Sequence, residues 1–261
     1  MLLALDVGNT SITLGMFRGK RLFSRGRIPT HRPGGAAAYR SAIRRFLRRS
    51  SVPAGAVGGV ILSSVVPRAT VSLKQVLKSV LKLKPYVVGE NIQAPVINRY
   101  GVPSQVGQDR LVNAAAACFL YKGPAIVVDF GTAITIDLVT RRREYRGGMI
   151  VPGMEIALEA LSSRAALLPK IKLERPREDL GRDTVSSMRS GIFYGYGSLC
   201  DGIVRLLMKK YAPKAKVIAT GGHCRLIAPF CRTIRIVNPD LTLKGLEITH
   251  RVKIHPSTGS G

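Results

Sequence analysis

The chain has 261 residues, enough for one large domain or for two of about 130 residues each, and we expect two compact halves. Apolar residues make up 46% and charged residues 21% of the sequence, which predicts a packed, soluble protein and excludes an intrinsically disordered one. Only five apolar residues precede Asp6, and no apolar run approaches the roughly 20 residues of a membrane span. We therefore expect a cytoplasmic protein with no signal peptide and no membrane helix.

The charge is unusual, because 41 Lys and Arg residues against 15 Asp and Glu residues give a net charge of +26. A field of that size attracts nucleic acids, anionic lipids or phosphorylated metabolites without regard to their sequence. The basic residues at 40–49 and 74–82 follow a helical spacing beside apolar stripes. We expect them on the solvated backs of core helices rather than on a dedicated binding face.

In chain order, the sequence predicts three neighbouring strands, then alternating strands and helices, and then the same order again. Apolar runs predict strands at residues 2–7, 12–17, 20–28, 57–64, 85–89, 125–129, 134–139, 145–151, 215–219 and 233–237. Helical periodicity predicts helices at residues 35–50, 68–82, 107–121, 153–164, 184–211, 222–229 and 240–250. A YKGP break at 121–124 indicates domains at 1–122 and 123–252, followed by a flexible tail at 253–261.

The two halves begin with similar motifs. Shifted by 123 residues, the stretch LALDVGNTSITL at 3–14 lies over residues 126–137, which aligns Asp6 with Asp129 and Gly8 with Gly131. Each half also has a later strand that runs into small residues, VILSSVVP at 60–67 and VIATGG at 217–222. Matching acids within a matching order of elements indicate a duplicated α/β unit.

The tip of the first predicted hairpin, DVGNT, combines an acid with small polar residues. Gly8 lets backbone N–H groups approach a ligand closely. Short donors follow at Asn9, Thr10, Ser11 and Thr13. These groups can cradle phosphate, and because a carboxylate repels phosphate, Asp6 makes sense there if Mg²⁺ lies between them.

A second such turn, at 129–132, could hold a polyphosphate from the other side, so the pair of turns indicates nucleotide chemistry. The alternative is that both are ordinary hairpin turns, for which Asp, Gly, Asn and Thr are the usual residues.

A third acid, Asp109, stands at a predicted helix start within VPSQVGQDRLVNAAAA at 102–117. A carboxylate there could accept a proton from a substrate alcohol during phosphoryl transfer, while Arg110 offers a donor fork to a substrate carboxylate. The alternative is a helix-capping Asp followed by a first-turn Arg, which is common.

These motifs, in this order and spacing, resemble those of the type III pantothenate kinases. The resemblance covers residue 1 to about 250. It rests on DVGNTSITLGMF, SSVVP (63–67), YxxPxxVGxDR (100–110), DFGTAITID (129–137), GGMIVPGMEIALEAL (147–161), LPxI (168–171), GxDT (181–184), SGIFYGYGSLCDGIV (190–204), VIATGG (217–222) and NPDLTLKGL (238–246).

The resemblance implies an α/β fold of two duplicated actin-like, ribonuclease H-like domains with mixed sheets. It also implies a homodimer that phosphorylates pantothenate to 4′-phosphopantothenate with ATP, the first step of coenzyme A synthesis. By position, the expected ATP contacts are Asp6, Val7, Gly8, Asn9, Thr10, Ser11, Ile12, Thr13 and Thr132, with Asp6 near Mg²⁺. The expected pantothenate contacts are Tyr100, Gly107, Gln108, Asp109, Arg110 and Thr184, with Thr184 reaching in from the second subunit.

The resemblance makes Asp109 the proton acceptor and assigns Asp129 to an activating monovalent cation, K⁺ or NH₄⁺. This assignment replaces the divalent ion that the residues alone suggested at Asp129, although either cation would neutralise charge between two anions. Two positions depart from the family pattern, Val102 before the Pro and Gln108, and both flank the expected pantothenate site.

The alternative function is a regulatory or nucleic-acid-binding paralogue on the same fold, which the net charge would suit. A degenerate enzyme is expected to lose a catalytic acid, but Asp6, Asp109 and Asp129 are all present. Aromatic residues make up only 6% of the chain and do not alternate with basic ones, so base stacking is poorly provided for. We therefore favour the kinase, with no specific nucleic-acid partner.

Overall fold

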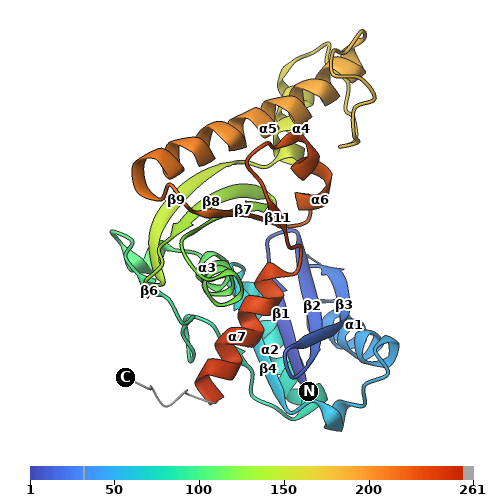
Figure 1. The fold of residues 1–261 in the computed structure, drawn as a ribbon. Helices are drawn as coiled ribbons and strands as arrows, with labels where there is room; N and C mark the ends of the chain where they lie inside the picture. The colour runs from blue at the N-terminus through green and yellow to red at the C-terminus, as the bar shows by residue number, and fades with distance from the viewer. Residues whose placement is uncertain (32, 255–261) are drawn as a thin grey trace. The chain divides into compact units, whose positions relative to one another are not determined.

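The computed structural model describes residues 1–31 and 33–254, and the chain divides into two compact units. The first unit comprises Met1–Ile97, Gly101–Phe119 and the residues from Leu241 onward. The second comprises Asn98–Tyr100 and Leu120–Asp240. Figure 1 labels most of the helices and strands of both units.

The first unit is a five-stranded mixed sheet with helices, and its strands follow the order β3-β2-β1-β4-β5 (Figure 1). The strands are β1 (Leu2–Val7), β2 (Ser11–Arg18), β3 (Arg21–Pro29), β4 (Gly59–Ser64) and β5 (Tyr86–Val87). The helical elements are α1 (Gly35–Arg49), η1 (Ala54–Ala56), α2 (Pro67–Leu81), η2 (Pro103–Gln105), α3 (Gln108–Tyr121) and α7 (Leu241–Ile254). Strand β1 is central, antiparallel to β2 and parallel to β4.

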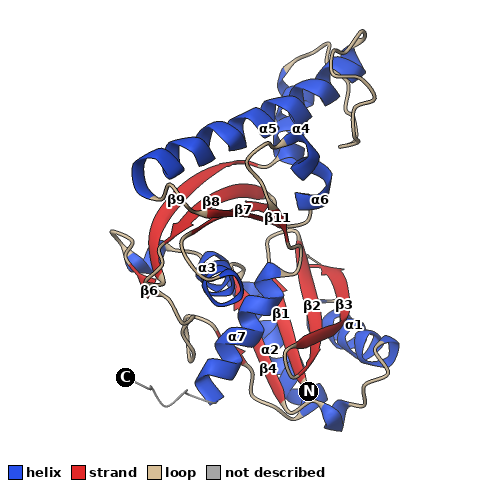
Figure 2. Cartoon of the chain, in the orientation of Figure 1, coloured by secondary structure: helices blue, strands red, loops and turns tan. Residues whose placement is uncertain are grey.

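The second unit has a six-stranded sheet in the order β11-β10-β7-β8-β9-β6. The strands are β6 (Ile97–Asn98), β7 (Ala125–Phe130), β8 (Ala133–Val139), β9 (Glu144–Pro152), β10 (Lys216–Thr220) and β11 (Ile236–Val237). The helical elements are α4 (Met154–Arg164), α5 (Thr184–Tyr211), α6 (Cys224–Ile227) and η3 (Ala228–Phe230). Figure 2 shows the long helix α5, which contacts β8 and α4.

The two sheets repeat one topology, which confirms the predicted duplication. Strands β9-β8-β7-β10-β11 of the second unit follow the same order and directions as β3-β2-β1-β4-β5 of the first. The registers differ by one residue at the tip, because Val7 pairs with Ile12 across the first hairpin and Phe130 pairs with Ile134 across the second. The second turn is therefore one residue shorter.

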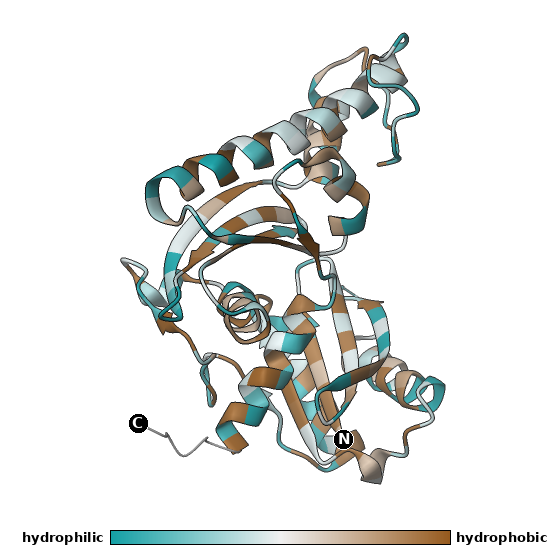
Figure 3. Ribbon diagram, viewed as in Figure 1, coloured by the Kyte–Doolittle hydropathy of each residue, from teal (hydrophilic) through white to brown (hydrophobic). Residues whose placement is uncertain are grey.

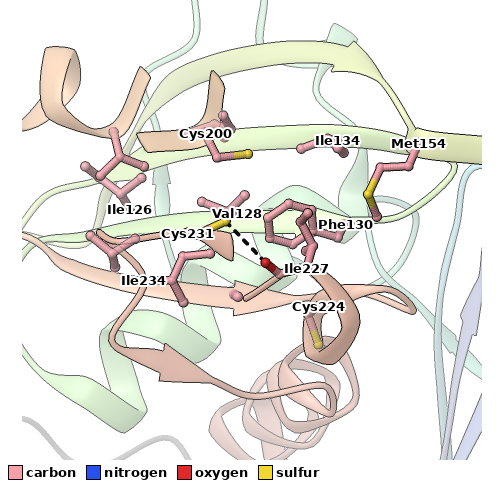
Figure 4. Close-up of a cluster of buried hydrophobic side chains, with 14 of the residues drawn as sticks. Ile126, Val128, Phe130, Ile134, Met154, Cys200, Cys224, Ile227, Cys231 and Ile234 are labelled. Carbon is pink, nitrogen blue, oxygen red and sulfur yellow. Dashed lines mark hydrogen bonds between the residues drawn. The ribbon is translucent and has the colours of Figure 1, made fainter. Parts of the chain in front are cut away.

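Each unit buries its own apolar core, and Figure 3 shows the central strands largely in the colour of hydrophobic residues. In the first unit, Ile43 and Phe46 of α1 pack with Leu5 and Leu14 of the sheet. The arginines of α1 at 40, 44, 45, 48 and 49 are exposed, as expected for the solvated back of a core helix. In the second unit, Phe130, Cys200 and Ile227 belong to one cluster (Figure 4).

The division into units differs from the expected domains in two segments. The main break falls at Phe119/Leu120, close to the expected residue 122, but the short segment Asn98–Tyr100 groups with the second unit and α7 groups with the first. Helix α7 contacts β1, β2 and β4, and Gly245 lies so close to α3 that a Cβ atom there would be 2.3 Å from the carbonyl oxygen of Val112. Of the expected tail at 253–261, Lys253 and Ile254 end α7, and residues 255–261 lie outside the described residues.

The other differences concern short elements. Strands β5 and β11 are two residues each and shorter than predicted, and β6 was not predicted. The helix expected at 222–229 is a short α6 that passes into the 3₁₀ turn η3, where Pro229 cannot donate a backbone hydrogen bond. Short strands bury few residues, so their periodicity in the sequence is weak.

Candidate active site

Asp6 lies near the end of β1, in the middle of the first sheet. Its register neighbours are Thr13 on β2 and Ser63 on β4, and the Ser63 hydroxyl donates a hydrogen bond to Asp6 Oδ1 at 2.8 Å. Burial, and then the nearby charge of Asp109, raise the pKa of Asp6 to about 7, although the Ser63 hydrogen bond acts in the opposite direction. The fold thus brings two acids together that are far apart in the sequence.

Hydrogen bonds hold the backbone of the turn that follows Asp6, whereas side chains at its tip are exposed. The N–H of Gly8 donates to the Ser11 carbonyl at 3.1 Å, and the Thr30 hydroxyl donates to the Gly8 carbonyl at 2.6 Å. The N–H of Thr30 donates to the Thr10 carbonyl at 3.1 Å. Asn9 and Thr10 themselves are exposed, so the tip presents polar groups to solvent on a fixed backbone.

Thr30 was not a candidate in the sequence. It is buried, and Tyr39 of α1 donates a hydrogen bond from its hydroxyl to the Thr30 carbonyl. A single threonine after a strand has no distinctive pattern, so only the folded chain shows that it supports the turn.

The other residues of the expected ATP loop differ in what their side chains can do. Val7 and Ile12 are buried in the core, so they can reach a ligand only through their backbone. The Ser11 hydroxyl accepts a hydrogen bond from Arg27 Nε at 2.7 Å, and Thr13 is half-buried beside Asp6.

Asp109 stands in the first turn of α3. Its Oδ1 accepts a hydrogen bond from the N–H of Arg110 at 2.9 Å, and a Cβ atom on Gly107 would lie only 2.5 Å from that oxygen. Any larger residue at 107 would therefore clash with the Asp109 carboxylate in this orientation. Arg110 is buried, unlike the usual solvated first-turn arginine, which favours a binding role over a purely helical one.

Gln108 is one of the two departures from the family pattern, and its side chain occupies space that is left by the missing side chain of Gly89. Gly89 has a φ of 87°, and a Cβ atom there would lie 2.6 Å from Gln108 Cδ. The side-chain oxygen of Gln108 is buried and has no hydrogen-bond partner among residues 1–31 and 33–254. An unmet buried acceptor is costly, so this oxygen is suited to an N–H or O–H of a ligand.

Tyr100 belongs to the second unit, where three residues support its ring. Gly147 has a φ of 108°, and a Cβ atom there would lie 3.3 Å from the Tyr100 ring. The ring centre of Tyr145 lies 6.3 Å from that of Tyr100, and the Tyr145 hydroxyl donates to Asp137 Oδ1 at 2.8 Å. Both Asp137 and Tyr145 are buried, and the sequence did not single them out.

Asp129 occupies in the second unit the position that Asp6 has in the first. It pairs in register with Thr135 on β8 and Thr220 on β10, as Asp6 pairs with Thr13 and Ser63. The Thr220 hydroxyl oxygen is buried and has no hydrogen-bond partner within the described part of the chain.

Gly221, with a φ of 90°, passes so close to Asp129 that a Cβ atom would lie 2.3 Å from its Oδ1. Thr132 is exposed in the turn, and its carbonyl accepts a hydrogen bond from the N–H of Gly153 at 3.0 Å.

Thr184 is the exposed first residue of α5 and lines a cavity of about 710 Å³ in the second unit. Asp183 caps the helix, because its carboxylate accepts a hydrogen bond from the N–H of Ser186 at 2.9 Å. The cavity is also lined by Leu161, Leu168, Met188 and Ile192, so Thr184 borders an apolar surface.

The first unit thus brings together Asp6, the turn after it and the Gly107–Arg110 segment, whereas Tyr100, Asp129, Thr132 and Thr184 lie in the second unit. Among the described residues, no group of three or more His, Cys, Asp or Glu side chains could hold a metal ion. A cation at Asp6 or Asp129 therefore needs further oxygen ligands from the backbone, water or a bound substrate. Over the same residues, no helix has the length and apolar character to cross a membrane.

Comparisons with known proteins identify the family of the chain. The family model described as type III pantothenate kinase matches residues 2–206. A type III pantothenate kinase of Halalkalibacterium halodurans is 40% identical over 254 residues, which cover 97% of this chain and 100% of that protein. One of Bacillus cytotoxicus is 42% identical over 246 residues, or 94% of each chain.

Among solved structures, the ROK hexokinase of Thermus thermophilus aligns with a TM-score of 0.52 at 16% identity, covering 98% of this chain and 99% of that one. That identity supports a statement about fold alone. The predicted fold is confirmed, since two duplicated mixed-sheet units of the actin-like type are present.

Proposed function

The chain belongs to the type III pantothenate kinase family, and from that premise we propose how its residues carry out the ATP-dependent phosphorylation of pantothenate to 4′-phosphopantothenate. The observation that carries the proposal is that Asp6 is buried near Asp109 in the first unit; burial first, and then the charge of Asp109, raise the pKa of Asp6. Two neighbouring carboxylates repel each other unless a cation or a proton lies near them. A kinase needs both, a cation for the phosphates and a proton acceptor for the alcohol.

The turn after Asp6 binds the phosphates of ATP. Backbone N–H groups and the exposed side chains of Asn9 and Thr10 donate hydrogen bonds to phosphate oxygens, and Thr30 keeps the turn in shape. Asp6 fits a ligand of the Mg²⁺ that accompanies ATP, because no cationic side chain among residues 1–31 and 33–254 lowers the pKa of its carboxylate. When bound, that ion neutralises phosphate charge. Thr132 is a further ATP contact.

Asp109 accepts the proton of the substrate hydroxyl as the phosphoryl group moves onto it. The backbone N–H of Arg110 and the space left by Gly107 hold the carboxylate in one orientation. The Arg110 guanidinium binds the carboxylate of pantothenate, and the unmet oxygen of Gln108 accepts a hydrogen bond from the same substrate.

The remaining assignments concern the second unit. Tyr100 contacts pantothenate through a ring held by Gly147 and Tyr145. Asp129 binds K⁺ or NH₄⁺, and the unmet Thr220 hydroxyl beside it supplies a further oxygen. Thr184 contacts pantothenate in the partner subunit of a homodimer.

The homodimer is supported by one face of α5, where Gly191, Gly195 and Gly202 have no atom within 4 Å of a Cβ position, and Leu199 and Leu206 are exposed. This stripe of small and apolar residues suits close packing against the same helix of a second copy. The dimer would act in the cytoplasm, where ATP is available. Light scattering of Leu199→Glu should report a monomer if the stripe is the interface, and an unchanged dimer would place the interface elsewhere.

The function is tested by coupled ADP release with pantothenate, comparing Asp109→Asn with the exposed control Asp179→Asn. We expect Asp109→Asn to lose roughly 10²-fold to 10⁴-fold in kcat while ATP affinity stays within about twofold, and the control to match the parent protein. Normal turnover of Asp109→Asn would remove Asp109 from the mechanism.

The cation assignment is tested by the same assay in buffers that contain K⁺, NH₄⁺ or only Na⁺. We expect activity to depend on K⁺ or NH₄⁺, and Asp129→Asn to lose that dependence. Equal rates in a purely sodium buffer would contradict the role of Asp129.

A further inference from the structure

The second unit contains a cavity of about 520 Å³ that no step of the proposed reaction uses. Its polar lining comes from the segment before α5, from α5 itself and from the turn after η3: Arg175, Tyr194, Ser198, Asp201, Arg205 and Arg232. Tyr194, Ser198, Asp201 and Arg205 follow one another at helical spacing on α5. They lie on a different flank of that helix from the stripe of Gly195, Leu199 and Gly202.

The charges of this cavity are unbalanced. Three guanidinium groups face one carboxylate, and that carboxylate is already engaged. Asp201 is buried and accepts hydrogen bonds from the backbone N–H groups of Arg232 and Thr233, both at 2.8 Å, and from the Thr233 hydroxyl at 2.7 Å. The main contacts of Asp201 are therefore hydrogen bonds that hold residues 232 and 233 in place, so the positive charge of the three arginines is largely left unbalanced.

The arginines differ in their partners. Arg205 lies 3.6 Å from Asp201, a loose contact for a side chain that is 60% exposed. Arg175 lies over the ring of Phe230 at 5.4 Å, and Tyr194 packs edge-on against the same ring at 5.1 Å. Within residues 1–31 and 33–254, neither Arg175 nor Arg232 has a carboxylate within salt-bridge distance.

A second cavity, of about 530 Å³, has two lining residues in common with the first. It shares Arg205 and Arg232 and adds Arg235 and Lys216. We call the surface formed by Arg175, Arg205, Arg232, Arg235 and Lys216 the basic trough. Lys216 is the member whose ammonium group already has a partner, because it donates to the Tyr121 carbonyl at 2.5 Å.

We propose that the basic trough binds an oligophosphate, a linear chain of several phosphate groups that is either inorganic or esterified to a nucleoside. Arginine forks match phosphate oxygens in pairs, and a series of cations along two cavities that share Arg205 and Arg232 suits a row of anions better than a single anion. Binding of single-stranded nucleic acid is less favoured, because it depends on open aromatic faces and the Phe230 ring is already covered by Arg175 and Tyr194.

The test is isothermal titration of the full chain with inorganic tripolyphosphate, in a second arm with GTP, and in a third arm with a single-stranded oligonucleotide. The variant Arg232→Glu is compared with Arg142→Glu, which makes the same change of charge at an exposed position outside the trough. The fold should tolerate Arg232→Glu, because Asp201 bonds to the backbone of residue 232 and not to its side chain. Arg175→Glu serves as a second trough variant.

We expect the parent protein and Arg142→Glu to bind tripolyphosphate at a site that both trough variants weaken by roughly tenfold or more. The KM values for ATP and pantothenate should stay unchanged in all variants, so a failure of this proposal is distinguishable from a failure of the proposed reaction. Equal GTP and tripolyphosphate binding at the trough would show that the phosphate chain alone is recognised, whereas binding of GTP alone would show the esterified form. The proposal would be overturned if Arg232→Glu, Arg175→Glu and Arg142→Glu all bound tripolyphosphate and GTP with the same affinity. It would also be overturned if a single-stranded oligonucleotide bound the trough more tightly than tripolyphosphate and GTP do.

Discussion

Asp6 should make the protein less stable as the pH rises, and the change Asp6→Asn should remove that dependence. Asn has nearly the same shape, and its side-chain oxygen can still accept the 2.8 Å hydrogen bond from Ser63. What the change removes is a carboxyl group whose pKa is about 7 in the folded chain, against an ordinary value of 3.8.

The sign follows from proton binding. Between pH 3.8 and about 7 the folded chain keeps a proton on Asp6 that the unfolded chain has released, so a rising pH favours the unfolded state. Each pH unit in this interval costs about 1.4 kcal/mol. The whole interval therefore lowers the free energy of unfolding by about 4 kcal/mol, and above about pH 7 the contribution is constant.

The assay is urea denaturation of metal-free protein at pH values from about 4.5 to about 8, for the parent chain and for Asp6→Asn. Other acids titrate in both proteins, so the difference in unfolding free energy isolates Asp6. This difference should grow by about 3 kcal/mol in favour of Asp6→Asn between about pH 4.5 and pH 7 and then level off. Asp109→Asn should reduce but not abolish the effect, because burial is the larger cause of the raised pKa. A difference that stays constant with pH would refute the reasoning.

Three further changes test other parts of the structure. Tyr145→Phe removes the hydrogen bond that ties the Tyr145 ring to buried Asp137, which keeps its hydrogen bond from the Thr135 hydroxyl at 3.0 Å. The variant should raise the KM for pantothenate several-fold with little change in the KM for ATP, because the Tyr100 ring loses support; equal changes in both constants would contradict this. Gly245→Ala should lower the melting temperature, since its Cβ atom would meet the Val112 carbonyl, whereas the control Gly55→Ala changes an exposed position of η1 with open space and should not. Burial alone would raise the pKa of Asp201, but the hydrogen bonds from Thr233 and Arg232 hold this pKa below the ordinary value. The stability that the ionised Asp201 gives is therefore lost as the pH falls. In urea denaturation at acid pH, Asp201→Asn should lose less stability with falling pH than the parent chain does.

The sequence could predict the parts of this protein that depend on local patterns. The six-residue runs of β1 and β7 are apolar up to an acid, and the acid and glycine at each tip mark the turn. Helices with a clear apolar stripe, such as α1, were predicted to within one residue. The repeated acids at 6 and 129 indicated the duplication, and both sheets confirm it.

The sequence could not show which distant residues meet. Thr30 supports the turn after Asp6 only because β3 returns beside β2, and Asp137 supports Tyr100 only through Tyr145 on the next strand. Helix α7 follows the second unit along the chain, but its apolar face packs on β1 of the first. Local periodicity fixes which face of an element is buried, whereas the partner of that face depends on contacts between residues far apart in the chain, and these exist only in the tertiary structure.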